Sequence, residues 1–169
     1  KKPYLAEWWK IIKMQSVSAE SKKEVDRSRT ETMEFPLTDV QHAYWVGRNP
    51  DQVMGGISCY LYFEFECGEI DRQRLSKAWE NVQYLHSSLR TKFLESGTQV
   101  IQDKPYNSSI IIYDLQQLDE TEKKEKMEAV RNEYSHKVLA VERGEVAVLI
   151  LSVIGKNKTI LHFGIDLLV

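Results

Sequence analysis

The alternation of apolar and polar residues predicts strands in several parts of the chain. In residues 59–66 (CYLYFEFE), the apolar Cys, Leu, Phe and Phe alternate with Tyr, Tyr, Glu and Glu. This period of two is typical of a strand with two different faces. Residues 145–154 and 159–165 are apolar at nearly every position, as in strands covered on both faces, and GKNK between them predicts a hairpin turn. A short segment at 98–102 after the turn at 95–97, and a short apolar run at 109–114, complete the predicted strands.

Apolar residues at helical spacing predict two helices, each opened by an aspartate. Asp71 is the expected N-cap of the first, and Asp119 with Glu122 forms a capping box at the start of the second. The first helix is expected to bury a broad face, made of Leu75, Ala78, Trp79, Val82 and Leu85. The second has a narrow apolar stripe, made of Met127, Val130, Tyr134 and Val138. Its other positions are rich in charge, so we expect a solvated outer face.

Residues 35–48 (FPLTDVQHAYWVGR) predict a short capped helix after an extended lead-in. Pro36 fixes its own φ and disfavours helix at the residue before it. Thr38 is the expected N-cap, with Gln41 as its reciprocal partner in a capping box. Gly47 is the expected helix stop. The expected apolar face is Val40, Ala43, Tyr44 and Gly47.

Composition and charge narrow the possible functions. The chain has 169 residues, is 42% hydrophobic and 28% charged, and carries a net charge of −2, which is ordinary for a globular domain and gives no basic footprint for nucleic acid. No apolar run approaches the roughly 20 residues of a membrane helix, and residues 1–10 lack signal-peptide architecture. Cys59 and Cys67 would lie roughly 25 Å apart on one strand, too far for a disulfide. We therefore expect a cytoplasmic protein without a zinc site, a nucleic-acid partner or a membrane partner.

The stretch 35–48 resembles the opening motif of heterocyclisation domains of nonribosomal peptide synthetases, F-P-L-T/S-x-x-Q-x-A-Y-x-x-G-R, at every named position. Tyr44, Gly47 and Arg48 are motif residues on this resemblance. Near the other end, in ILHFGIDLLV, Asp166 stands where these domains begin the motif D-x-x-x-x-D-x-x-S. Ordinary amide-forming condensation domains have H-H-x-x-x-D-G there. Asp166 therefore favours a heterocyclisation domain.

Two further segments bear on this resemblance. His86, Leu89, Arg90 and Phe93 match the H-x-x-L-R-x-x-F of condensation-type domains, where we expect the histidine and arginine to have structural roles. Residues 55–58 (GGIS) look like the G-G-x-S of a carrier protein, whose serine receives phosphopantetheine. That serine needs an exposed helix start, whereas Ser58 runs into the strand at 59–66, so we reject the carrier interpretation.

The resemblance implies a domain organisation and a fold. Residues 1–14 are similar to the last helix of carrier-protein domains, or form a docking helix, and the polar residues 15–32 have linker composition. Residues 33–169 would be the N-terminal lobe of a truncated heterocyclisation domain. The implied fold is an α/β two-layer sandwich, the chloramphenicol acetyltransferase-like lobe that forms half of a V-shaped two-lobe condensation domain.

The implied reaction joins an upstream acyl thioester to the amine of a carrier-bound cysteine, serine or threonine, and then closes a thiazoline or oxazoline ring with loss of water. The partners would be the upstream and downstream carrier domains, which bring phosphopantetheine, and the missing C-terminal lobe. No cofactor or metal is expected to bind this chain directly. Catalytic residues of the family lie in the second lobe, so none is assigned here.

Three residues receive supporting interpretations. Asp166 is expected to be a salt-bridged structural carboxylate, and Arg48 is expected to form an ion pair near the tunnel mouth. His162 is either a hydrogen-bonded interior residue or part of a tunnel wall. Three alternatives stay open: an amide-forming condensation domain, a free-standing acyltransferase of the same fold, and a noncatalytic module that binds a carrier.

Overall fold

The computed structural model describes residues 34–51 and 55–169. The chain divides into two units, residues 1–31 and 32–169, and all described elements belong to the second. The predicted helix at 1–14 and the predicted linker therefore lie outside the described residues.

The larger sheet has four strands in the order β2-β7-β6-β5. The strands β2 (Tyr60–Cys67), β7 (Lys158–Asp166) and β6 (Ala147–Gly155) pair antiparallel, and β5 (Ile111–Asp114) pairs parallel with β6. The β6–β7 hairpin is as predicted. Most residues of β6 are buried, whereas buried and half-buried residues are interspersed along β7.

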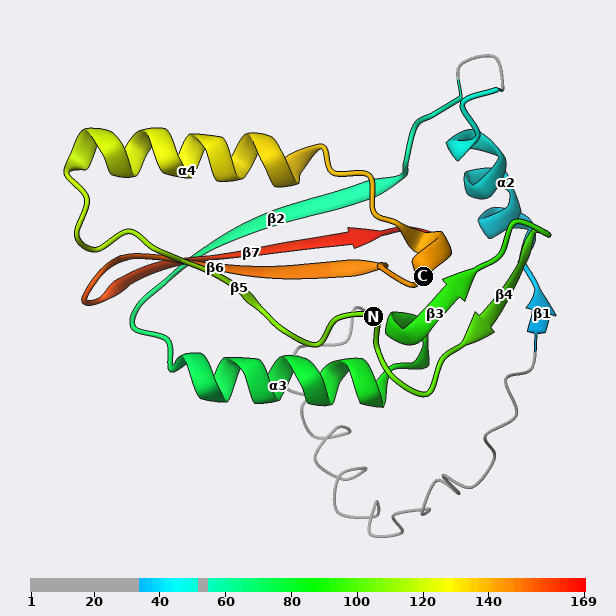
Figure 1. The fold of residues 1–169 in the computed structure, drawn as a ribbon, viewed down its shortest axis with the longest axis horizontal. Coiled ribbons are helices and arrows are strands. Elements are labelled where there is room, and N and C mark those ends of the chain that lie inside the picture. Colours follow the sequence, from blue (N-terminus) through cyan, green and yellow to red (C-terminus); the bar gives the residue numbers. More distant parts are fainter. Residues whose placement is uncertain (1–33, 52–54) are drawn as a thin grey trace, which may run out of the picture. The chain divides into compact units, whose positions relative to one another are not determined.

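Two helices cover opposite faces of this sheet (Figure 1). Helix α4 (Glu120–Ser135) lies over one face, and α3 (Arg72–Leu85) lies over the other, where Trp79 packs edge-on against Phe163 of β7. The predicted α/β sandwich, with helices packed against a mixed sheet, is confirmed.

The smaller sheet gathers three short strands that are far apart in the sequence. The strands β1 (Glu34–Pro36), β4 (Thr98–Ile101) and β3 (Thr91–Phe93) pair antiparallel in that order. The helix α2 (Asp39–Arg48) follows β1 directly and lies beside this sheet (Figure 1). The 3-10 turns η1 (Ser87–Arg90) and η2 (Val141–Arg143) complete the described elements.

The core lies between the α4 face of the larger sheet and the smaller sheet. It contains Phe93, Val130, Tyr134, Leu139, Val141, Val146, Val148, Ile150 and Leu168. These residues come from both sheets, from α4 and from the loops that join them, so the two sheets share one packed interior.

The buried faces of the two long helices differ from the predicted ones. Within α3 the buried residues are Trp79 and Gln83, so the predicted broad face is wrong: Leu75 is half-buried, and Ala78, Val82 and Leu85 are exposed. The predicted stripe of α4 is buried up to Tyr134, but Val138 is 60% exposed because the helix ends at Ser135. Both capping predictions, at Asp71 and Asp119, are confirmed.

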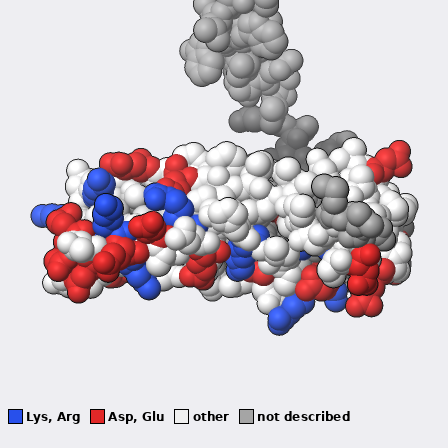
Figure 2. Space-filling view, turned by 90° about the horizontal axis from the view of Figure 1, so that it is seen from above, with Lys and Arg blue, Asp and Glu red and all other residues white. Residues whose placement is uncertain are grey.

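Acidic and basic side chains are intermingled on the face that carries α4, so this face presents no extended field of one sign (Figure 2). Across residues 34–51 and 55–169, no helix is long and apolar enough to cross a membrane. The same residues contain no group of three or more His, Cys, Asp or Glu side chains placed to hold a metal ion.

Candidate functional site

The helix α2 presents a different face to the core from the one that its apolar residues predicted. The capping box is present, because Thr38 Oγ1 accepts from the Gln41 backbone and the Thr38 backbone N–H donates to Gln41 Oε1. Val40, however, is 62% exposed. The inward residues are Gln41, Tyr44, Trp45 and Arg48, which recur every three or four positions. The inward face of α2 is therefore determined by its polar residues at the two ends of the helix, Gln41 and Arg48. A pattern of hydropathy does not identify such residues as inward-facing.

Gly47 is not the helix stop. The helix continues through Gly47 to Arg48, and Asn49 is the C-cap. A left-handed glycine would have ended the helix one residue earlier and turned the chain away. Continuing the helix keeps Arg48 on the inward face.

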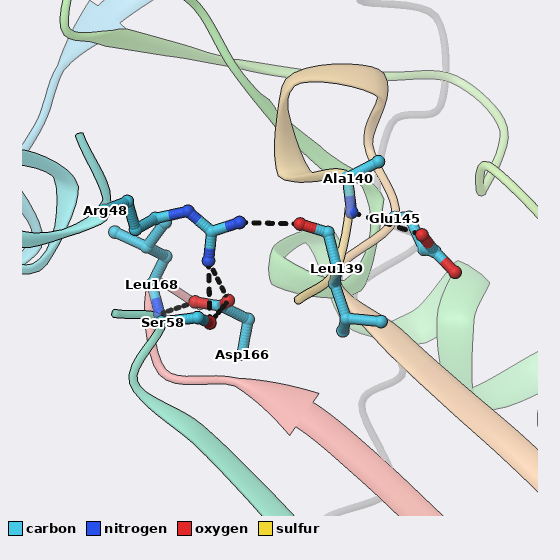
Figure 3. A network of polar contacts seen from close by, with 7 residues as sticks. All are labelled: Arg48, Ser58, Leu139, Ala140, Glu145, Asp166 and Leu168. Carbon is cyan, nitrogen blue, oxygen red and sulfur yellow. Dashed lines mark hydrogen bonds and ion pairs between the residues drawn. The ribbon is translucent and has the colours of Figure 1, made fainter. Parts of the chain in front are cut away.

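Arg48 and Asp166 form a buried ion pair at the C-terminal end of β7 (Figure 3). Arg48 Nη1 donates to Asp166 Oδ2, and the second guanidinium nitrogen, Nη2, donates to the Leu139 carbonyl at 2.6 Å. The exposed fraction is 11% for the Arg48 side chain and 1% for the Asp166 side chain. The other carboxylate oxygen, Oδ1, accepts from the Leu168 backbone N–H at 3.1 Å. Both ions thus have the additional hydrogen bonds that a buried pair requires.

Ser58 is the third member of this network, and sequence reasoning missed it. Its hydroxyl donates to Asp166 Oδ2 at 2.7 Å and accepts from Arg48 Nη1 at 2.8 Å, so it sits between the two charged groups (Figure 3). Ser58 belongs to the GGIS stretch, for which the only role considered from the sequence was a carrier motif. It is partly buried, engaged by two charged groups and not at a helix start, which agrees with the rejection of that interpretation.

Gln41 was predicted as a capping residue and does more than cap. Its Nε2 group donates to the Leu168 carbonyl at 2.6 Å, and Gln99 of β4 donates to its Oε1 at 2.9 Å. One amide therefore joins α2, the smaller sheet and the segment after β7. Together, Gln41 and Arg48 attach both ends of α2 to residues 166–168, more than 110 positions away in the sequence.

His162 has no exposed surface. Its two ring nitrogens are both engaged, Nε2 with the Ser152 hydroxyl at 2.9 Å and Nδ1 with the Tyr62 hydroxyl at 2.7 Å. Burial lowers the pKa of the imidazole, against the nearby Glu64 charge, which raises it. Of the two interpretations of His162, the structure fits the hydrogen-bonded interior residue, since a side chain without exposed surface cannot line a tunnel.

His86 and Arg90 have structural positions, in keeping with the expectation for the H-x-x-L-R-x-x-F segment. His86 is the C-cap of α3. Arg90 donates to the carbonyl groups of Gln83 and Gln102, at 3.1 and 2.5 Å, and so ties the end of α3 to the segment after β4. Three of its N–H groups donate to backbone carbonyls, which supports a structural role.

Tyr60 lies over Gly164, and its backbone pairs with Asp166 of the ion pair across β2 and β7. A Cβ atom on residue 164 would stand 1.7 Å from the Tyr60 hydroxyl, so the absence of a side chain there makes room for the phenol. The hydroxyl is buried without a hydrogen-bond partner. Burial, with the neighbouring charges of Glu145 and Asp166, raises the pKa of Tyr60 to about 12. Tyr60 also borders a cleft of about 330 Å³ with Ser58 and Val138.

Replacing Tyr60 by phenylalanine should stabilise the protein by about 1 kcal/mol, because it removes a buried hydroxyl that has no partner. Urea denaturation of the two proteins measures the difference. Tyr113→Phe is the matched control, because the Tyr113 hydroxyl pairs with that of Tyr134 at 3.3 Å and its loss should not stabilise. A loss of stability in Tyr60→Phe would mean that the hydroxyl has a partner.

Arg48, Asp166 and Ser58 form a polar anchor whose charged groups are engaged by one another and by the backbone of Leu139 and Leu168. The two cysteines, Cys59 and Cys67, are free thiols. The arrangement can fix the end of β7 and whatever follows Asp166 in the chain. It does not by itself supply a nucleophile paired with a base.

Comparison with known proteins places this chain in a family. No family model matches the sequence. Among curated proteins, the chain is 33% identical to pyochelin synthetase PchE of Pseudomonas aeruginosa over 99% of its length, and 35% identical to phenyloxazoline synthase MbtB of a Mycobacterium species over 79%. It spans 12% and 11% of those proteins, respectively.

Solved structures agree. The EpoB nonribosomal peptide synthetase cyclization-docking bidomain from Sorangium cellulosum superposes with a TM-score of 0.77 and 27% identity, covering 99% of this chain and 36% of that one. The starter condensation domain of rhizomide synthetase RzmA, at 15% identity and a TM-score of 0.66, shows the fold alone. The predicted lobe of the chloramphenicol acetyltransferase-like fold is thereby confirmed. The chain belongs to the heterocyclisation-domain family of the nonribosomal peptide synthetases and corresponds to its N-terminal lobe.

Proposed function

We propose that the protein of which this lobe is part condenses an acyl thioester with a carrier-bound cysteine, serine or threonine and cyclodehydrates the product to a thiazoline or oxazoline. One observation carries this proposal. Arg48, the last residue of the opening motif, is bonded to Asp166, the aspartate that stands where an amide-forming domain has histidine. The two stretches of sequence that distinguish the family thus meet in one buried pair.

The proposed chemistry has two additions and one elimination. The amine of the acceptor attacks the thioester carbonyl, the C–S bond breaks, and an amide and a free thiol result. The side-chain thiol or hydroxyl of the acceptor then adds to the amide carbonyl, and the carbonyl oxygen leaves as water while a C=N bond forms. Both additions develop an oxyanion, and the elimination needs a proton donor to the departing oxygen.

The role of this lobe is to hold one wall of the reaction chamber. Both substrates arrive on phosphopantetheine arms of partner carrier domains, and a fixed wall keeps the reacting carbon and nitrogen in one geometry. The Arg48–Asp166 pair supports this role, because it locks α2, the segment before β2 and the end of β7 together. Ser58 is not a phosphopantetheine attachment site, since its hydroxyl is engaged by both ions. Acid and base groups for the elimination are expected in the second lobe.

The test is a reaction between two loaded carriers on the complete two-lobe domain, followed by mass spectrometry of the product on the downstream carrier. We expect a product lighter by one water than the amide. An amide that accumulates without loss of water would identify an amide-forming condensation domain. Carriers that bind without any acyl transfer would identify a noncatalytic module. Either outcome refutes the proposal, and the first is disfavoured by Asp166.

Arg48→Lys in the same assay should lower ring formation per folded enzyme roughly tenfold to hundredfold, because lysine keeps the charge but cannot bridge Asp166 and the Leu139 carbonyl with a planar fork. Arg143→Lys is the matched control, since Arg143 is exposed and lies over the Tyr106 ring. Product is counted per folded protein, with the folded fraction taken from circular dichroism. Unchanged ring formation in Arg48→Lys would contradict the supporting role.

A further inference from the structure

A chain of hydrogen bonds runs from the interior of the larger sheet to the surface beneath α4. It begins at Ser152 of β6, passes through His162 of β7 and Tyr62 of β2, and reaches Glu64, also on β2. Arg131 of α4 then binds both oxygens of Glu64, at 2.9 and 2.8 Å. Four elements are thus connected by five side chains.

The directions of these bonds are fixed by donor counting. Tyr62 donates its single hydroxyl hydrogen to Glu64 Oε1 at 2.9 Å, so its oxygen must accept from His162 Nδ1. The imidazole therefore carries its hydrogen on Nδ1, and Nε2 accepts from the Ser152 hydroxyl. Every group is satisfied in this arrangement, provided that the imidazole is neutral and Glu64 is ionised.

The surroundings of His162 offer one charged neighbour of each sign. From β2 the facing titratable groups are Tyr62 and Glu64, and Glu64 Oε1 lies 3.6 Å from His162 Nδ1. From α4 the facing charge is Arg131, with Tyr134 farther along bonded to Tyr113 of β5. The sequence of β6 contains no titratable residue. Arg131 holds the pKa of Glu64 below its usual range, so Glu64 stays ionised at mildly acidic pH.

We propose that neutral His162 helps to hold α4 against the larger sheet, and that protonation of His162 at acidic pH releases the helix. A proton added to Nε2 places a cation in the core and removes the acceptor of the Ser152 hydroxyl. The added charge also draws Glu64 away from Arg131, the side chain by which α4 holds this carboxylate. β2 and β6 cannot move without breaking sheet pairs, whereas α4 covers this face from outside. Lifting α4 is therefore the least costly way to hydrate the imidazolium.

The expected pH dependence follows from linkage. Because burial lowers the pKa of His162 in the folded state, the unfolded chain binds more protons once the pH falls below about 6.5, the ordinary pKa of histidine. Stability contributed by the neutral ring is complete above that pH and is lost as the pH falls toward the folded-state pKa. One extra proton raises the unfolding equilibrium constant up to about tenfold for each pH unit.

The experiment compares wild type, His162→Gln and His86→Gln by urea denaturation from pH 7.5 to 5. His86 is an exposed histidine and serves as the matched control. We expect wild type and His86→Gln to share the acid-dependent slope and His162→Gln to lose most of it. Hydrogen exchange in wild type, expressed as protection factors, should show that residues 120–135 lose protection on acidification before residues 72–85. Equal slopes in all three proteins, or equal loss of protection in both helices, would overturn the proposal.

A measurement on the wild type keeps the proposal testable if His162→Gln does not fold. The ring ¹⁵N chemical shifts of His162 report both tautomer and charge. We expect the neutral Nδ1–H form at pH 7, and protonation that coincides with the loss of protection in α4. A ring that is already charged at pH 7, or one with its hydrogen on Nε2, contradicts the proposed bond directions and overturns the proposal.

Discussion

Replacing Asp166 by alanine should lower the free energy of unfolding by about 3–5 kcal/mol, because the guanidinium of Arg48 then stays buried without its counter-ion. Two further groups lose their acceptor at the same time, the Ser58 hydroxyl and the Leu168 backbone N–H. Urea denaturation measures the loss.

Asp114→Ala is the matched control, since Asp114 pairs with Arg72 on the surface and its removal should change stability little. A double-mutant cycle with Arg48→Met then separates the pair from its surroundings. We expect the double variant Arg48→Met/Asp166→Ala to lose less stability than the two single variants added together, because no charge is left unpaired. Additive losses would show that the two ions stabilise the fold independently.

Truncating Phe93 to alanine should cost about 3–5 kcal/mol of unfolding free energy, because a fully buried ring is replaced by a cavity. Phe93 lies in β3 of the smaller sheet and stacks on Trp45 of α2, with ring centroids 6.3 Å apart. It also packs in the core cluster with residues of β6 and α4. The ring therefore joins the two sheets, and thermal or urea unfolding should reveal the loss.

Leu85→Ala is the control for Phe93→Ala. It removes a large apolar side chain at a residue that is 78% exposed, and surface changes of this kind stay within about 0.5 kcal/mol. If Phe93→Ala were equally mild, the smaller sheet would fold without support from the core. A change in the dependence of unfolding free energy on urea, rather than in the midpoint, would indicate that the two sheets unfold separately.

Local patterns predicted most of the elements correctly. The capping boxes at Thr38 and Asp119, the N-cap at Asp71 and the β6–β7 hairpin all depend on residues that are close in sequence, and each forms as predicted. The motif resemblance placed the chain in its family, which the comparisons confirm. These successes share a cause, since capping and hairpin geometry are decided within a few residues.

The failures occurred where a distant partner or the end of a helix decided which residues are buried. Val40 was assigned to the buried face of α2 by hydropathy, yet Gln41 and Arg48 turn inward because Leu168 and Asp166 offer them partners. Val138 continued the apolar period of α4 but lies past the end of the helix. Hydrophobic periodicity does not register polar groups that are satisfied across the fold.

By itself, the sequence determined most of the secondary structure, the family and the two residues, Arg48 and Asp166, that matter most for the proposed function. Only the tertiary structure decided that these two bond directly to each other with Ser58 as a third member, and that His162 is buried in a chain of hydrogen bonds beneath α4. The reason is physical. Pairings such as these join residues about 100 or more positions apart, and their geometry exists only once the sheet has brought the strands together.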